Sequence, residues 1–171
     1  MKRKAKRKPA RKASPRKVQP MPKSYNAITP YLAIRGAAQA IDFYKQAFGA
    51  KEVMRMPGPG GKLGHAELKF GDAKIMLADE HEPMNFLGPQ ARGGSPVHMH
   101  LYVNDVDATV AKAVQLGAKV VREVQDMFYG DRSGTLEDPF GHFWHVATHK
   151  RDVSMAEMKR KAAEMAQQAG S

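Results

Sequence analysis

The chain has 171 residues, of which 42% are hydrophobic, and it contains no cysteine. This length is enough for one domain with a core, and the lack of cysteine excludes disulfides, thiol catalysis and thiolate metal sites. No apolar run approaches the roughly 20 residues that cross a membrane, and no apolar segment of a secretory signal follows the basic start. We therefore expect a cytoplasmic protein with no membrane partner.

The net positive charge is concentrated at the N-terminus. Residues 1–23 hold 11 of the 28 Lys and Arg residues and no acidic residue, which leaves 28 − 11 = 17 basic residues against 17 acidic ones in the rest of the chain. Lys and Arg alternate with Ala and Pro, so residues 1–23 are predicted to be a disordered basic tail. A block of this charge attracts phosphate backbones in a salt-dependent way. Nucleic acid or another polyanion is a candidate partner, and a solubility tail or an extra start is the alternative.

The first half of the remaining chain predicts the element order βαβββ. A strand is expected over residues 26–34, with Ile28, Leu32 and Ile34 on one face, followed by a helix over 37–48 that ends at Gly49. Further strands are expected over 51–56, 63–70 and 73–78, the last two joined by Gly71-Asp72, which is typical of a hairpin.

The same order recurs after a linker rich in Gly and Pro. Elements are expected at 97–103 (strand), 106–116 (helix), 119–124, near 135–137 and up to 148 (strands). Gly49-Ala50-Lys51 recurs as Gly117-Ala118-Lys119, and Phe70-Gly71 recurs as Phe140-Gly141. A unit repeated at about 70 residues indicates duplication. The sequence therefore predicts an α+β fold of two tandem βαβββ modules, about 25–79 and 97–149, joined by the linker 80–96.

Two stretches near the C-terminus have a clear structural interpretation. Asp138-Pro139-Phe140-Gly141 predicts a turn. In the strand that follows, Trp144 and Val146 are expected to pack under the helices while Phe143 and His145 face the other way. Residues 151–171 are predicted to add a C-terminal helix. Ser154 and Glu157 form a capping box there, and its stripe of Met155, Met158, Ala162 and Met165 favours packing on the body or on a dimer partner.

At this level of detail the sequence resembles a known family. The two modules resemble the vicinal oxygen chelate superfamily, and the motifs that carry the resemblance are Thr29-Pro30-Tyr31-Leu32, Ile41-Asp42-Phe43-Tyr44, Phe48-Gly49-Ala50, His65-Ala66-Glu67-Leu68 and Asp138-Pro139-Phe140-Gly141-His142. That superfamily contains glyoxalase I, the bleomycin-resistance proteins and the extradiol dioxygenases, and the similarity is strongest to its PhnB-like branch. The resemblance spans the domain of residues 24–150. It implies curved mixed sheets that each form a half-open cup with the helix outside, and a homodimer.

The resemblance also implies where ligands bind. The four metal-ligand positions of the enzymes in that superfamily fall on Thr29, Met76, His98 and His145. Strand alternation independently turns several side chains into the cups. The predicted ligand cavity consists of Thr29, Tyr31, Met76, His98, His100, Tyr102, Phe143 and His145.

Three functions remain open. Because two of the four metal positions are not metal ligands of the usual kind, the first is a metal-free or weakly metal-binding protein that holds a small aromatic or oxygenated molecule in the cup. The second is a lyase, isomerase or dioxygenase in which His98, His145 and Glu67 hold Zn, Ni, Mn or Fe, with Glu67 as the candidate catalytic carboxylate. The sequence leaves open whether the β-strand face of Glu67 lines the cup or meets water. The third is a platform protein that docks on nucleic acid through its tail.

Overall fold

The computed structural model describes residues 18–169, with side chains as far as Gln167. The first module contains β1 (Tyr31–Ile34), α1 (Ala37–Phe48), β2 (Lys51–Pro57), β3 (Leu63–Phe70) and β4 (Ala73–Asp79). The linker carries the short helix α2 (Pro89–Arg92). The second module contains β5 (His98–Tyr102), α3 (Val106–Gln115), β6 (Lys119–Asp126), β7 (Asp131–Glu137) and β8 (Phe143–His149), and α4 (Met155–Ala169) follows.

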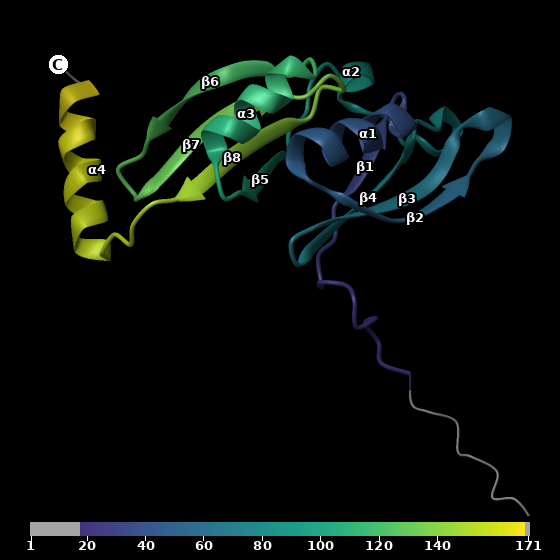
Figure 1. Cartoon of the computed structure of the whole chain (residues 1–171), viewed down its shortest axis with the longest axis horizontal. Coiled ribbons are helices and arrows are strands. Elements are labelled where there is room, and N and C mark those ends of the chain that lie inside the picture. The colour runs from purple at the N-terminus through teal and green to yellow at the C-terminus, as the bar shows by residue number, and fades with distance from the viewer. Residues whose placement is uncertain (1–17, 170–171) are drawn as a thin grey trace, which may run out of the picture.

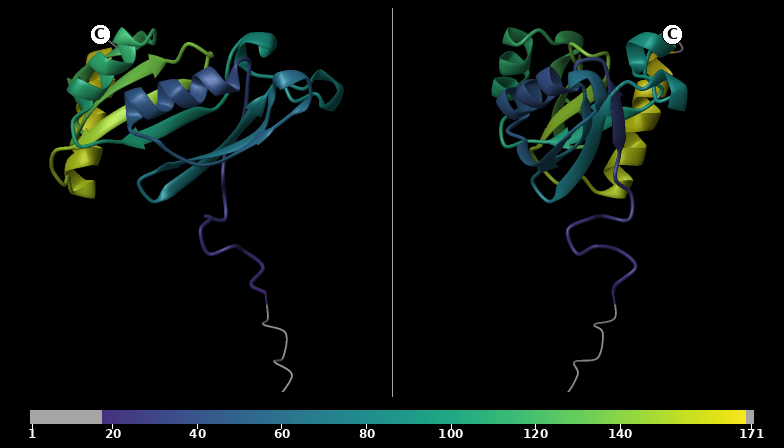
Figure 2. Two further views of the ribbon diagram at one scale, coloured as in Figure 1. Left: turned by 45° about the vertical axis from the view of Figure 1, so that its right-hand side comes forward. Right: turned by 90° about the vertical axis from the view of Figure 1, so that its right-hand side faces the viewer.

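Each module forms a four-stranded mixed sheet, in the orders β1-β4-β3-β2 and β5-β8-β7-β6. In each sheet the first strand runs parallel to the fourth, and the other neighbours are antiparallel. Figure 1 shows the two sheets end to end, and Figure 2 shows α1 and α3 side by side on the same side of them. The predicted α+β fold of two βαβββ modules is confirmed.

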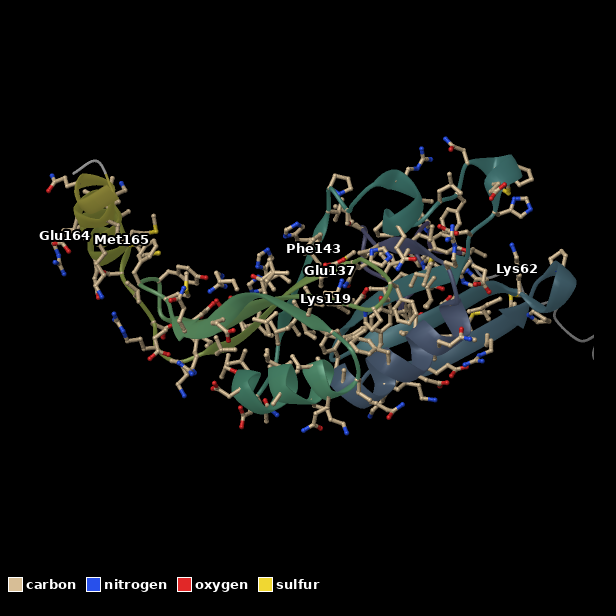
Figure 3. All side chains as sticks on the ribbon, turned by 90° about the horizontal axis from the view of Figure 1, so that it is seen from above. Lys62, Lys119, Glu137, Phe143, Glu164 and Met165 are labelled. Carbon is tan, nitrogen blue, oxygen red and sulfur yellow. The ribbon has the colours of Figure 1, made fainter. Side chains whose placement is uncertain are left out.

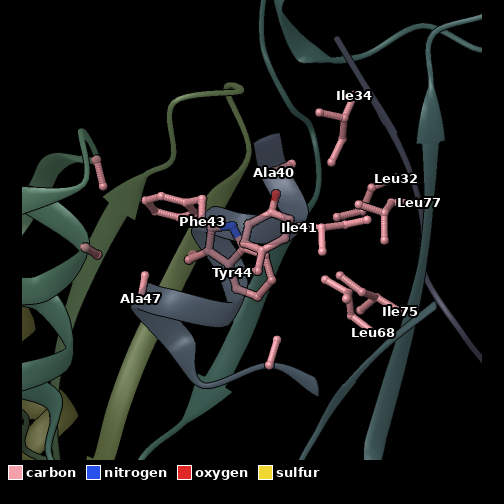
Figure 4. Packing of buried hydrophobic residues seen from close by; sticks show 14 of the residues in the cluster. Leu32, Ile34, Ala40, Ile41, Phe43, Tyr44, Ala47, Leu68, Ile75 and Leu77 are labelled. Carbon is pink, nitrogen blue, oxygen red and sulfur yellow. The ribbon is translucent and has the colours of Figure 1, made fainter. Parts of the chain in front are cut away.

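The two modules share one hydrophobic core beneath these helices. Ile41 and Tyr44 of α1 are fully buried against Leu68 and Leu77 of the first sheet (Figure 4). The core continues into the second module through buried residues of its helix and sheet: Val106, Val110, Leu136, Trp144 and Val146. Each large apolar side chain buried in this way contributes about 1.5–3 kcal/mol. The predicted inward direction of Trp144 and Val146 is therefore confirmed.

A buried carboxylate joins α1 to the turn between β7 and β8. Asp138, which is 3% exposed, accepts hydrogen bonds at Oδ2 from Tyr44 Oη at 2.7 Å and from Trp144 Nε1 at 2.9 Å. Its Oδ1 accepts the backbone N–H groups of Phe140 and His142, both at 2.9 Å. Gly141 has a φ of 88°, a left-handed conformation that favours glycine. The predicted turn is present, and it also fastens the two modules together.

Several predicted strand boundaries were wrong. The first strand begins at Tyr31 rather than at residue 26, and Ile28 is 85% exposed, whereas Leu32 and Ile34, predicted on the same face, are buried. Pro30 has no N–H to donate to a sheet, so pairing begins after it. In the second module β6 and β7 are longer than predicted, because Ser133-Gly134 lies within β7 although its composition suggests a turn. Gly134 packs there against Arg122 and Val124.

The additional C-terminal helix is present and begins at Met155. The backbone N–H groups of Lys150 and Arg151 donate to the Gly130 carbonyl at 3.0 and 3.1 Å, which fixes the segment leading to the helix. Figure 3 shows Met165 at the end of the molecule opposite to Lys62. Residues 1–17 of the predicted tail and residues 170–171 of the predicted helix lie outside the described residues. No helix within 18–169 is long and apolar enough to cross a membrane.

Candidate functional site

The face of each sheet opposite to its helix, here called the open face, carries the predicted ligand residues. In the second sheet His98 pairs in register with Phe143, and His100 pairs with His145. Since Met99, Leu101, Trp144 and Val146 pack into the core, alternation turns these histidines to the open face. Tyr102 lies on the same face and is 59% exposed. The structure therefore brings five of the eight predicted cavity residues together on one sheet.

A chain of hydrogen bonds runs across this open face. Thr135 Oγ1 lies 2.9 Å from His145 Nδ1, and His145 Nε2 lies 2.9 Å from His98 Nδ1. The His98 ring stacks on Phe143 with its centroid at 4.7 Å. Burial lowers the pKa of His145, and the neighbouring His98 and His100 lower this pKa further. A neutral imidazole has one N–H and one lone pair, so His145 can form one hydrogen bond to Thr135 and one to His98. His98 is the outer member of this chain and is the group that a ligand would meet.

A second network closes the far end of the same face. Tyr102 Oη donates to Asp131 Oδ2 at 2.8 Å, and His149 Nδ1 lies 2.7 Å from Asp131 Oδ1. His149 Nε2 lies 3.1 Å from Asp152 Oδ1, in the segment that leads to α4. The carboxylates of Asp131 and Asp152 raise the pKa of His149. Through these bonds the network connects Tyr102 to the segment that leads to α4.

The open face of the first sheet has different chemistry at the corresponding places. Tyr31, 46% exposed, pairs in register with Met76, which pairs with Glu67. Tyr31 Oη lies 2.9 Å from His65 Nδ1, and its ring meets Phe86 edge-on at 5.1 Å. Thr29 does not lie on the strand. It precedes β1, and its hydroxyl donates to the Asn26 carbonyl at 3.4 Å.

Glu67 also lies on this open face, which resolves the orientation that the sequence left open. It is 3% exposed, and its Oε2 accepts a hydrogen bond from Lys74 Nζ at 3.0 Å. Its Oε1 accepts the hydroxyl of Tyr25 and lies 3.8 Å from His65 Nε2. The hydrogen bond from Tyr25, followed by that from Lys74, lowers the pKa of Glu67 although burial opposes the change.

Two cavities flank Tyr31. The larger has a volume of about 830 Å³ and is lined by residues that include Leu63, Ala78 and Met84. The smaller, of about 410 Å³, lies toward the second module, where Met99 and the buried His142 line it. Tyr31 and Phe86 belong to the walls of both cavities. Of the predicted cavity residues, Tyr31 alone lines these two cavities.

The arrangement does not assemble the predicted metal centre within one chain. The two facing nitrogens of His98 and His145 could serve as ligands, but Glu67 belongs to the other sheet and binds Lys74 and Tyr25. Within the part of the chain that the structure describes, no group of three His, Asp or Glu residues is placed to hold a metal ion. Catalytic metal sites typically use three protein ligands, so this donor set does not fit one.

Sequence reasoning missed several residues of the open faces: Tyr25, His65, Lys74, Thr135 and Asp131. The hairpin at Gly71-Asp72 contained a signal for one of them. Its register aligns Phe70 with Ala73 and therefore Glu67 with Met76. Lys74 lies two positions before Met76 and so shares a face of the sheet with Glu67. The contact of Tyr25 left no such signal, because it depends on the path of the segment before β1.

The comparisons with known proteins agree with this fold. The family model described as the Glyoxalase/Bleomycin resistance protein/Dioxygenase superfamily matches residues 26–146, and the chain belongs to that superfamily. An uncharacterized protein of Mycobacterium bovis is 44% identical over 136 residues, which cover 78% of this chain and 90% of the relative.

Solved structures show the same architecture. A gene product of Arabidopsis thaliana is 29% identical with a TM-score of 0.59, and the match covers 72% of this chain and 98% of that one. A PhnB protein from Bacillus cereus is 19% identical with a TM-score of 0.57, covering 72% and 99% of the two chains. At that identity the second likeness concerns the fold alone.

Proposed function

We propose that this protein binds a small aromatic or oxygenated molecule at the open faces of its sheets and needs no metal to do so. We also propose that the chain belongs to the PhnB-like branch, to which its sequence motifs point and with whose fold the Bacillus cereus structure agrees. In this proposal Tyr31 and Phe86 hold an aromatic ring, while polar groups of the cavity wall, such as Lys62 and His81, bind its oxygen atoms.

The cavity of about 830 Å³ beside Tyr31 carries the proposal. Its volume lies in the range of about 300–1,000 Å³ that small-molecule sites occupy, and such sites combine apolar walls with a few polar groups. The wall here has that character, since Tyr31, Phe86 and Met84 supply aromatic and thioether surface. Charged groups are added by Lys62 and by the carboxylates of Asp79, Glu80 and Glu82.

A ligand screen on the full chain tests this function. Thermal shifts are measured against a panel of aromatic antibiotics and other aromatic compounds, and hits are titrated by calorimetry. Tyr31→Ala and Phe86→Ala are expected to weaken a genuine hit by about tenfold or more, because each removes an aromatic wall. The matched control is Phe128→Ala, which breaks an aromatic pair with Tyr129 in the other module. A panel without hits, or equal loss in the control, would contradict the proposal.

One observation keeps a metal-dependent lyase, isomerase or dioxygenase as the second candidate. His98 Nδ1 and His145 Nε2 lie 2.9 Å apart as hydrogen-bond partners, so a rotation of one ring would bring both nitrogens to face one ion. Elemental analysis of untagged protein, followed by Zn, Ni, Mn and Fe titration, decides between the two functions. Near-stoichiometric metal that is lost in His98→Ala would favour the enzyme, and dicarbonyl, thioester and catechol substrates would then be tested.

The basic tail supports a separate proposal. Residues 1–23 hold 11 Lys and Arg residues while the rest of the chain is balanced in charge, so we propose that the tail binds nucleic acid or another polyanion. This association would act beside the ligand site.

A further inference from the structure

The phenol side chain of Tyr25 packs against the buried ion pair of Glu67 and Lys74. Its hydroxyl donates to Glu67 Oε1, and the ammonium of Lys74 lies 4.2 Å from the centroid of its ring. Lys74 Nζ also donates to Glu67 Oε2 at 3.0 Å and to Ser24 Oγ at 3.3 Å. One phenol ring is thus held at its oxygen by a carboxylate and at its face by a cation.

The groups that hold this ring come from the sheet, whereas the ring itself comes from a segment outside it. Glu67 and Lys74 lie on β3 and β4 and are 3% and 9% exposed. Residues 22–30 have no strand partner along their length, apart from the Pro30 carbonyl that accepts the Met76 N–H at 2.8 Å. Such a segment can leave the sheet without breaking a strand ladder.

The acid–base pair does not need Tyr25 for charge balance. Glu67 and Lys74 already form an ion pair with each other. The second oxygen of Glu67 accepts the Tyr25 hydroxyl, and Lys74 donates a further hydrogen bond to Ser24. The corresponding position in the second sheet is Thr135, opposite His145, and it offers no carboxylate. The second sheet therefore has no such acid–base pair at the corresponding position.

We propose that Glu67 and Lys74 form a binding subsite for a phenol, and that Tyr25 occupies this subsite as an internal ligand until a phenolic molecule displaces it. The proposal rests on the proposed binding function and gives its ligand class: an aromatic ring with a free hydroxyl. The Glu67 carboxylate accepts a hydrogen bond from the hydroxyl of the ligand, and the Lys74 ammonium lies over its ring in a cation–π contact. The same hydrogen bond between the Tyr25 hydroxyl and Glu67 raises the pKa of Tyr25.

Chemical rescue tests this subsite. The probe is p-cresol, which is the side chain of tyrosine as a free molecule, and toluene is its counterpart without the hydroxyl. In the full-length Tyr25→Ala protein the subsite is vacated, so p-cresol is expected to bind about tenfold more tightly than to the wild type and to restore lost thermal stability. Toluene is expected to bind at least about tenfold more weakly than p-cresol, since it cannot bond to the carboxylate.

Three further variants in the Tyr25→Ala background identify the site. Glu67→Gln is expected to lower the affinity for p-cresol by about tenfold, because it removes the charged hydrogen-bond acceptor. Phe128→Ala in the other module is the matched control and is expected to leave p-cresol binding unchanged. Phe86→Ala reports instead on the cavity beside Tyr31. If Phe86→Ala lowered the affinity for p-cresol and Glu67→Gln did not, the subsite would be overturned and the proposed function would stand. Equal affinity for p-cresol in wild type and Tyr25→Ala would also overturn it.

A measurement on the wild type covers the case in which Tyr25→Ala fails to fold. Saturating p-cresol is expected to shift the NMR resonances of the Tyr25 ring toward those of an exposed tyrosine, because it displaces the ring from the Lys74 ammonium. The ring resonances of Tyr129 in the other module serve as the internal control and are expected to stay unchanged. Unchanged Tyr25 resonances at saturating p-cresol would contradict displacement of Tyr25.

Discussion

The two modules have nearly the same backbone and the same buried side, yet their open faces differ completely. By strand register Tyr31, Met76 and Glu67 of the first sheet correspond to His100, His145 and Thr135 of the second. On the helix side, in contrast, both sheets present apolar residues to one shared core. Tight packing constrains the buried side after duplication, whereas the open face can change its chemistry without disturbing the fold.

The turns before the last strands add a second difference. The first module uses the two-residue hairpin Gly71-Asp72, while the second uses the longer turn from Asp138 to His142. Only the longer turn places a buried carboxylate against α1 of the other module. The second module therefore supplies the polar link that fixes the first one.

The largest effect is expected at this link. Asp138→Ala removes the acceptor for Tyr44 and Trp144, which are 0% and 2% exposed, and leaves both donors without a partner. We expect a loss of about 3 kcal/mol or more in the free energy of unfolding, measured by urea denaturation. Asp126→Ala, which removes an exposed partner of Arg132, is the control and is expected to cost less than about 1 kcal/mol. Similar losses in both variants would contradict the role of the link.

The next largest effect separates the two open faces. Glu67→Ala leaves Lys74 buried without its counter-ion, so the free energy of unfolding is expected to fall by about 3 kcal/mol. Thr135→Ala at the corresponding position removes one hydrogen bond to His145 and is expected to cost about 1 kcal/mol. Adding Lys74→Met to Glu67→Ala is expected to recover part of the loss, because the unpaired charge disappears. The absence of any recovery would show that the pair is not coupled.

A smaller effect depends on pH and belongs to the second module alone. Asp131 and Asp152 raise the pKa of His149 above its usual value of about 6.5, so the folded state binds a proton more tightly than the unfolded state. The stability from this group is complete below the unfolded pKa and is lost as pH rises through the folded pKa.

Melting temperatures of the wild type and His149→Gln between pH 5.5 and 9 test this assignment. The wild type is expected to lose its advantage over the variant as pH rises through this range. His81→Gln, which replaces a linker histidine, is the control and is expected to leave the pH profile unchanged. A constant difference between wild type and His149→Gln across the range would contradict the assignment.

The sequence predicted the buried half of the molecule much better than the open half. The repeat and the strand alternation placed α1, β3 and the inward residues Trp144 and Val146 correctly, because burial imposes a strict period on a sequence. The histidines of the second sheet were placed on the correct face by the same argument. Contacts that depend on an irregular segment, such as Tyr25 against Glu67, have no period and were not found.

The smallest effect on stability is expected from the basic tail. Deleting residues 1–23 leaves Ser24 and Tyr25 in place, so the melting temperature is expected to stay nearly unchanged, while retention on DNA at low salt is expected to be lost. Deleting residues 1–26 is the matched comparison. It removes the same charge and also the contacts of Tyr25, so it is expected to lower the melting temperature as Tyr25→Ala does. A protein without residues 1–23 that still bound DNA would place the polyanion site within residues 24–171, whose charges balance as 17 basic against 17 acidic residues.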